Sequence, residues 1–210
     1  MIIKIGVKMN KSICVFLFIF LSLYGCKDNN NPAESNITKR VLLPLKVGDQ
    51  WEYQRTSLDS TGNIRTFDTI VCQVEFDTTF LNEIWYKTFW GFVREEDDGL
   101  WQYYGSSSNV QEIEYSTLQY VYPSTASYSY RPFGANSTIT VMSVNESYTT
   151  PSQTFQCYHY RLIYDNTNGY QQDYYLSPNI GFVKWEDGIK GSSGKWYTSN
   201  KYELISYEIE

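Results

Sequence analysis

Apolar and polar residues alternate along most of the chain after residue 42, which predicts β-strands because successive side chains of a strand point to opposite faces. The longest such run covers residues 64–76, in which Ile70 and Cys72 share one side while Gln73 and Glu75 share the other. We expect one long strand here, in a sheet that has one buried face and one solvated face.

Residues 84–93 are apolar on both faces, which predicts a central strand that is covered on both sides or that lines a cavity. An acidic turn follows and ends in Asp98-Gly99, and an Asp-Gly pair between two apolar runs is a strong signal for a hairpin. The aromatic residues around this predicted hairpin are the candidate ligand-binding residues of the chain: Trp85, Phe89, Trp90 and Trp101.

Further predicted strands continue to residue 209 at a spacing of roughly ten residues, and no helix is predicted after residue 40. Tyr, Phe and Trp make up 18% of the chain, and aromatic residues favour strands. We therefore predict one all-β domain over residues 41–210, mainly antiparallel. A sandwich, a barrel or a strongly curved sheet would each fit this spacing.

A short apolar run, Ile13–Tyr24, lies behind three lysines near the start of the sequence. A membrane-spanning helix needs about 20 apolar residues, so this run predicts the core of a signal peptide instead. The run ends in Leu23-Tyr24-Gly25-Cys26, which resembles a bacterial lipobox. The resemblance implies that residues 1–25 are a lipoprotein signal peptide and that Cys26 carries the lipid, including palmitate.

Residues 26–40 are polar and rich in asparagine, so we expect a flexible tether between the lipid and the β domain. Two or more acyl chains anchor a protein stably, and the resemblance therefore implies a lipid-anchored protein of the outer membrane. Lys27-Asp28 resembles the export signal of Bacteroidetes surface lipoproteins. The periplasmic face and the cell surface both stay open as locations.

The charge balance argues against a nucleic-acid partner. The chain has a formal net charge of −6, and removal of residues 1–25, which contain three lysines and no acidic residue, makes it more negative. Proteins that bind nucleic acids need clustered Lys and Arg to neutralise phosphates. We expect the membrane, reached through the lipid anchor, to be the partner of the N-terminal segment.

Two cysteines remain in the predicted β domain, Cys72 and Cys157, and each lies in a strand-like run. Outside the cytoplasm such a pair can form a disulfide, provided that the two strands are neighbours or face one core. The alternative is two buried free thiols. Zinc binding is not predicted, because the chain has no Cys-x-x-Cys and one histidine.

No catalytic residue and no cofactor is predicted. The single histidine, His159, lies in an alternating strand, and no nucleophile motif accompanies it. The acidic turn Glu95–Asp98 lacks the ligand spacing of an EF-hand, which favours a solvated turn over a metal site. A glycosidase with two carboxylates from distant strands is the enzyme class that the sequence leaves open.

Three motifs occur in a familiar order: Leu43–Tyr53, the hairpin within Phe92–Tyr103, and Tyr174–Lys184. Together they resemble segments of uncharacterised Bacteroidetes-type lipoproteins that are related to the LolA/LolB half-barrel. The resemblance implies a strongly curved antiparallel sheet, or half-barrel, with an apolar inner face. The motifs contain turn and core residues, so they imply no active site.

Three hypotheses for function follow. The first is a non-catalytic binding module for an apolar or amphipathic ligand, held in a concave surface. The second is a surface protein that binds glycans or mediates adhesion through exposed Tyr and Trp. The third is a structural lipoprotein that meets an assembly partner. An open groove would favour the first, an exposed planar row of aromatic rings the second, and complete burial of the aromatic rings the third.

Overall fold

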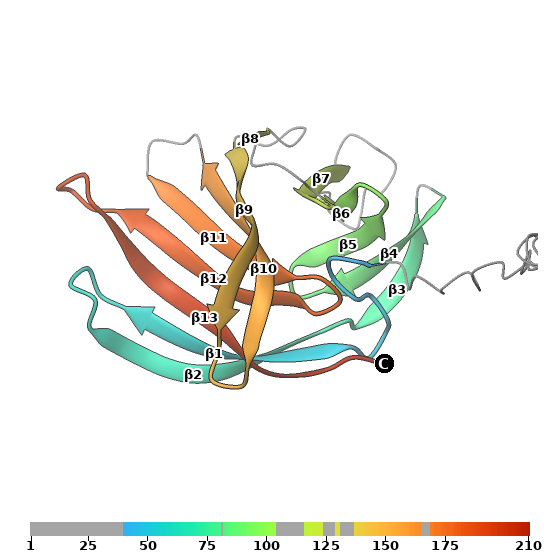
Figure 1. The fold of residues 1–210 in the computed structure, drawn as a ribbon, viewed down its shortest axis with the longest axis horizontal. Helices are drawn as coiled ribbons and strands as arrows, with labels where there is room; N and C mark the ends of the chain where they lie inside the picture. Colours follow the sequence, from blue (N-terminus) through green and yellow to red (C-terminus); the bar gives the residue numbers. More distant parts are fainter. Residues whose placement is uncertain (1–39, 81, 104–115, 124–128, 131–136, 165–168) are drawn as a thin grey trace, which may run out of the picture. The chain divides into compact units, whose positions relative to one another are not determined.

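The computed structural model describes residues 40–80, 82–103, 116–123, 129–130, 137–164 and 169–210 (Figure 1). The chain divides into two units, Met1–Lys39 and Arg40–Glu210, and the fold below is that of the second unit. The predicted signal peptide, Cys26 and residues 27–39 of the tether lie outside the described residues.

The described residues form two antiparallel sheets and no helix, which confirms the predicted all-β class. The larger sheet has the strand order β2-β1-β13-β12-β11-β10-β9-β8. Its strands are β1 (Gln50–Leu58), β2 (Ile64–Gln73), β8 (Ser129–Tyr130), β9 (Ser137–Thr149), β10 (Thr154–Tyr164), β11 (Tyr170–Ser177), β12 (Gly181–Lys190) and β13 (Trp196–Glu208). The smaller sheet contains, in order, β3 (Phe76–Phe80), β4 (Glu83–Thr88), β5 (Gly91–Glu96), β6 (Gly99–Tyr103) and β7 (Ser116–Val121).

The larger sheet is strongly curved, as predicted. In Figure 1, β9 and β10 pass in front of β11, β12 and β13. The hydroxyl of Tyr148 on β9 donates a hydrogen bond to Glu203 on β13, although three strands separate β9 from β13 in the sheet. The pairs β9–β10, β11–β12, β12–β13 and β1–β13 all contain register shifts. Such bulges bend a strand and increase its twist, which accounts for the curvature.

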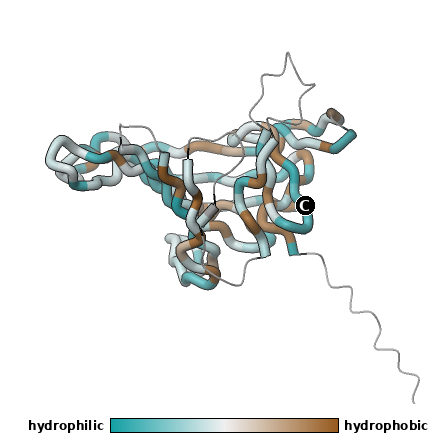
Figure 2. Tube along the Cα trace, turned by 90° about the horizontal axis from the view of Figure 1, so that it is seen from above, coloured by the Kyte–Doolittle hydropathy of each residue, from teal (hydrophilic) through white to brown (hydrophobic). Residues whose placement is uncertain are grey.

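The two sheets face each other across an aromatic cluster that is centred on Trp90, in the turn between β4 and β5. The Trp90 ring lies 4.3 Å from Phe182, 6.1 Å from both Trp51 and Trp185, and 6.4 Å from Tyr53, all in the larger sheet. Aromatic pairs at such distances contribute about 0.5–1.5 kcal/mol each beyond their burial. Figure 2 shows hydrophobic stretches in the body of the domain, while the loops at its left end are hydrophilic.

A second contact between the sheets involves β7. The Tyr120 ring packs 5.1 Å from Tyr160 and 5.5 Å from Tyr174, and the Tyr160 hydroxyl donates to the carbonyl oxygen of Val121 at 2.7 Å. The smaller sheet therefore contacts the larger sheet at two places, its β4–β5 turn and β7.

The polar atoms of the buried aromatic residues of β1 form hydrogen bonds. The indole N–H of Trp51 donates to the carbonyl oxygen of Ile180 at 2.6 Å, and the hydroxyl of Tyr53 donates to that of Phe182 at 2.8 Å. A Cβ atom on Gly181, which has a φ of +93°, would lie 2.3 Å from Leu43. The predicted motifs around residues 43–53 and 174–184 therefore pack against each other in the core.

Residues 84–93 are not one central strand, so that prediction is wrong. They form the hairpin β4–β5, which turns at Phe89 and Trp90. The hydroxyl of Thr88 donates to the Gly91 carbonyl and accepts from the Trp90 N–H, and Gly91 adopts a φ of +101°. The aromatic turn is stabilised by the half-buried Trp90 ring, which packs against the core between the sheets.

Residues 64–76 are not one strand either. The chain leaves the larger sheet after Gln73. The N–H of Val74 donates to the backbone carbonyl oxygen of Asp49, and the N–H of Glu75 donates to that of Lys87 in the smaller sheet. The predicted inward side is confirmed for Cys72, which is buried, but Phe76 begins β3 and is 46% exposed. The predicted hairpin at Asp98-Gly99 is confirmed as the connection between β5 and β6.

Candidate functional site

The four aromatic residues that the sequence suggested as ligand contacts do not share one cavity. Phe89 and Trp90 lie together in the β4–β5 turn, with ring centroids 5.9 Å apart. Trp85 and Trp101 lie on the other face of the smaller sheet, on either side of Arg94. Trp85 is fully buried and Trp90 and Trp101 are half-buried, so these three indoles form no exposed planar row.

The candidate disulfide is not formed. Cys72 on β2 and Cys157 on β10 are both free and buried, and β1, β13, β12 and β11 lie between their strands. Burial raises the pKa of each thiol to about 12. In this structure both residues act as small apolar side chains of the core, which is the alternative that the sequence left open.

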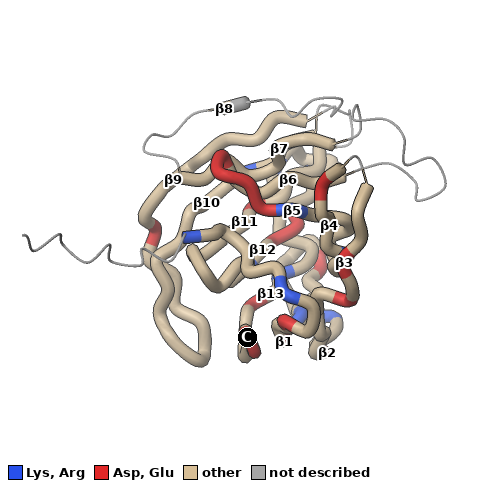
Figure 3. The backbone as a smooth tube through the Cα atoms, turned by 90° about the vertical axis from the view of Figure 1, so that its right-hand side faces the viewer, with Lys and Arg blue, Asp and Glu red and all other residues tan. Residues whose placement is uncertain are grey.

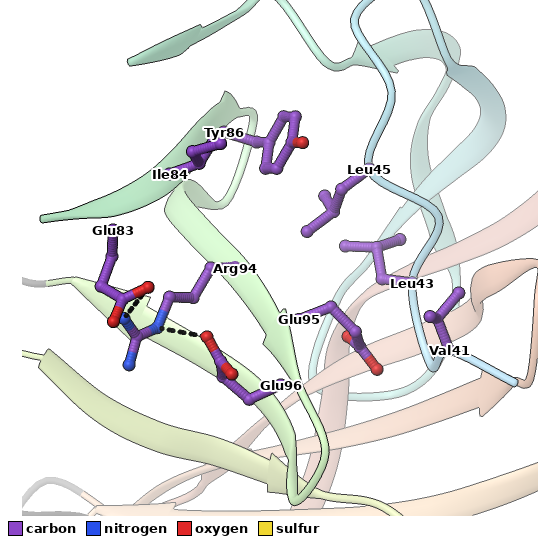
Figure 4. A pocket seen from close by; sticks show the side chains of 9 residues that line it. All are labelled: Val41, Leu43, Leu45, Glu83, Ile84, Tyr86, Arg94, Glu95 and Glu96. Carbon is purple, nitrogen blue, oxygen red and sulfur yellow. Dashed lines mark ion pairs between the residues drawn. The ribbon is translucent and has the colours of Figure 1, made fainter. Parts of the chain in front are cut away.

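A surface groove of about 370 Å³ lies between the segment 41–45 and the hairpin β4–β5 (Figure 4). One side is apolar and one end is charged, as the sticks in Figure 4 show. The side chains that line this groove are Val41, Leu43, Leu45, Glu83, Ile84, Tyr86, Arg94, Glu95 and Glu96. None of these residues was predicted as a ligand contact, because the two walls lie about 40 residues apart in the sequence.

The segment 41–45 is fixed in place by contacts to both sheets. The N–H of Val41 donates to the Asn179 side chain at 3.1 Å, and the N–H of Asn179 donates to the Val41 carbonyl at 2.8 Å. The N–H of Leu42 donates to the Glu95 carboxylate at 2.6 Å, and the side chains of Leu42 and Leu43 are fully buried. The groove is therefore preformed, with a rigid apolar wall.

The charged end of the groove is organised around Arg94. Its guanidinium lies 3.5 Å from the Glu83 carboxylate and 3.4 Å from that of Glu96, and it packs 4.8 Å from the Trp85 ring. Arg94 thus meets two carboxylates, and Glu95 adds a third to the groove. Figure 3 shows the acidic residues running on through the turn after β5. The end of the groove is therefore net negative, which favours a cationic group.

His159 lies away from this groove, in an ion-pair network on the other face of the larger sheet. Its Nδ1 is 2.9 Å from Glu146 and its Nε2 is 2.7 Å from Asp173, while its ring stacks 4.3 Å from Tyr175. The imidazole thus lies between two carboxylates, one at each ring nitrogen. The network ties β9, β10 and β11 together, which gives His159 a structural role.

Metal-binding clusters and membrane-spanning helices are both absent from the described part of the chain. It contains no cluster of three or more His, Cys, Asp or Glu side chains that could hold a metal ion. It also contains no helix of the length and hydrophobicity that a membrane span needs.

Comparison with known proteins yields structural likeness alone. No family model matches the sequence, and no curated protein is similar to it. A candidate exported protein with a YmcC-like fold from Bacteroides fragilis aligns with 14% identity and a TM-score of 0.41. A candidate lipoprotein from Parabacteroides distasonis aligns with 15% identity and a TM-score of 0.36. Each alignment covers 80% of this chain and 99% of the other chain. The likeness is too distant to assign this chain to a family.

The His159 network predicts a pH-dependent stability. Burial alone would raise the pKa of Asp173, but the hydrogen bonds from His159 and Arg161 outweigh it and lower that pKa. The pKa of Asp in an unfolded chain is about 3.9, and the folded chain lowers the pKa of Asp173 below its ordinary value. Ionised Asp173 therefore stabilises the fold at neutral pH, and this stabilisation is lost as the pH falls below about 4. We expect Asp173→Asn to lower the free energy of unfolding by about 2 kcal/mol at pH 7, measured in urea.

At pH 3 the difference between Asp173→Asn and the unchanged protein should shrink. Asp77→Asn, on the exposed edge strand β3, serves as the control and should alter stability little at either pH. An Asp173→Asn effect of the same size at both pH values would show that its charge does not stabilise the network.

Proposed function

We propose that this chain is a lipid-anchored protein of the cell envelope whose β domain binds an amphipathic ligand in the groove between residues 41–45 and β4–β5. The observation that carries the proposal is the combination of an apolar wall and an acidic end in one preformed groove of about 370 Å³. Ligand pockets of proteins typically enclose about 300–1,000 Å³.

The apolar part of the ligand would lie against Ile84, Tyr86 and Leu45. Ile84 is 52% exposed, so covering it removes apolar surface from water. Burial of a large aliphatic side chain contributes about 1.5–3 kcal/mol when it is complete. The polar part would lie near Glu83 and Glu96, where a cationic group meets net negative charge. A lipid or lipopeptide with an amine has this chemistry.

A binding role accounts for this groove better than a catalytic one. Its described lining contains no Ser, Cys, Thr, His or Lys that could act as a nucleophile or base. The carboxylates of Glu83 and Glu96 are engaged by Arg94, and that of Glu95 accepts the Leu42 N–H. These groups hold the groove in shape, and they can orient a charged ligand without reacting with it.

The envelope location rests on the sequence of residues 13–26. The apolar run and the Gly25-Cys26 junction support export and lipidation at Cys26, in the outer membrane on its periplasmic face or at the cell surface. A protein held close to a membrane meets amphipathic molecules, so the proposed ligand class agrees with the proposed location.

Ligands with tails of similar length and opposite charges test the groove. We expect the purified protein to bind dodecyltrimethylammonium more tightly than dodecanoate, below their micelle concentrations, in isothermal titration calorimetry. Ile84→Ser should weaken binding of the cationic probe about tenfold, which corresponds to about 1.4 kcal/mol of lost apolar contact. Ile163→Ser is the matched control, because Ile163 is 40% exposed and lies on β10 outside the groove. Equal binding of both probes, or an equal effect of both substitutions, would contradict the proposal.

The lipid anchor is tested separately. Cys26→Ala should move the protein from the membrane fraction to the soluble fraction, with the circular dichroism of a folded β domain, because the anchor would be the membrane attachment. Ser12→Ala, on the other side of the apolar run, should leave the protein in the membrane fraction. Retention of Cys26→Ala on membranes at high salt would show that another part of the chain binds the membrane.

A further inference from the structure

The strand β2 is one edge of the larger sheet, and none of the described strands pairs with its outer side. It is ten residues long and carries three large exposed apolar side chains. Ile64 is 65% exposed, Phe67 61% and Val71 57%. An edge strand of this kind offers unpaired backbone N–H and C=O groups next to apolar surface, which favours pairing with another strand.

The usual protections of an edge are weak on β2. Edge strands are commonly short, carry Lys or Pro, or are interrupted by bulges. β2 contains no Lys and no Pro, and its one register shift with β1 lies at its beginning. Its two charged residues are Arg65 and Asp68, and Asp68 forms an ion pair with Arg55 on β1. The middle of the strand is therefore open to pairing.

The sequence of β2 is complementary to itself in one antiparallel register. If a two-fold axis passes through Thr69, Phe67 of each copy lies opposite Val71 of the other, and Thr69 lies opposite Thr69. Pairs of an aromatic with a β-branched residue, and Thr–Thr pairs, each contribute about 0.2–1 kcal/mol in antiparallel sheets. The two-fold axis generates the Phe67–Val71 pair twice, so both exposed apolar side chains of each copy are covered by the other copy.

The charges agree with the same register. Arg65 lies opposite Gln73 of the other copy, so this exposed charge meets a neutral polar side chain. Asp68 would lie opposite Ile70, but its charge is already neutralised by Arg55. The register therefore places no like charges directly opposite each other across the apolar centre.

We propose that two copies of this chain associate through β2, antiparallel and centred on Thr69, so that their larger sheets become one continuous sheet. The complementarity of β2 with itself favours a second copy over an unrelated strand. The groove at β4–β5 lies on the smaller sheet, so this dimer neither requires nor blocks the proposed ligand site.

Cysteine cross-linking tests the register in the full, membrane-anchored chain in detergent. Residues opposite each other in antiparallel strands have Cβ atoms about 4.5–5.5 Å apart, so Thr69→Cys should be joined to its copy by a short bis-maleimide. The matched control is Thr61→Cys, in the exposed β1–β2 turn, whose copies would lie on the order of 50 Å apart along the strands. Cys72 and Cys157 are buried and should add little background. We expect at least tenfold more cross-linked dimer for Thr69→Cys.

A second variant makes the result independent of cross-linking. Phe67→Lys places a charge on the apolar centre, and because Phe67 is 61% exposed the fold should persist. We expect multi-angle light scattering to give a dimer for the unchanged chain and a monomer for Phe67→Lys, with the same circular dichroism. A monomeric unchanged chain, or equal cross-linking of the two cysteine variants, would overturn the proposal.

Discussion

Trp90 packs against four aromatic rings of the larger sheet, and this contact determines how the two sheets meet. A two-sheet β domain needs side chains from both inner faces to exclude water between them. Here the smaller sheet supplies one large indole from a hairpin turn and Tyr120 from β7, while the larger sheet supplies a preformed aromatic surface. The position of β4 and β5 follows from that docking.

The candidate groove depends on the same docking. One of its walls is the β4–β5 hairpin, and the other is the segment 41–45, which is bonded to Asn179 of the β11–β12 turn and to Glu95 of β5. Because the segment contacts both sheets, the width of the groove is fixed by the core rather than by flexible loops. A preformed site loses little conformational entropy on binding. The strand order of the larger sheet, by contrast, leaves β2 at an edge that no described strand covers, where association with another strand costs no rearrangement of the core.

The alternation of residues and the turn chemistry sufficed to predict the all-β class and the Asp98-Gly99 hairpin, because these depend on local sequence. The spacing of strands left a sandwich, a barrel and a curved sheet open, and the curved sheet was expected from the resemblance of three motifs alone. The hairpin at Phe89-Trp90 was missed because its turn is aromatic, and the one local signal was Gly91 after it. The groove was missed because its walls are brought together by tertiary packing. The separation of Cys72 and Cys157 depends on strand order, which alternation along one chain does not encode.

The central claim is that Trp90 docks the smaller sheet on the larger one, and amide hydrogen exchange of Trp90→Ala tests it most directly. Loss of the ring should lower the protection of β4–β7 while β1 and β10–β13 keep theirs, because the larger sheet retains its own strand pairing. Trp196→Ala, at a position that is 41% exposed, should leave both sheets protected. Unchanged protection of β4–β7 in Trp90→Ala, or an equal loss in both sheets, would contradict the account.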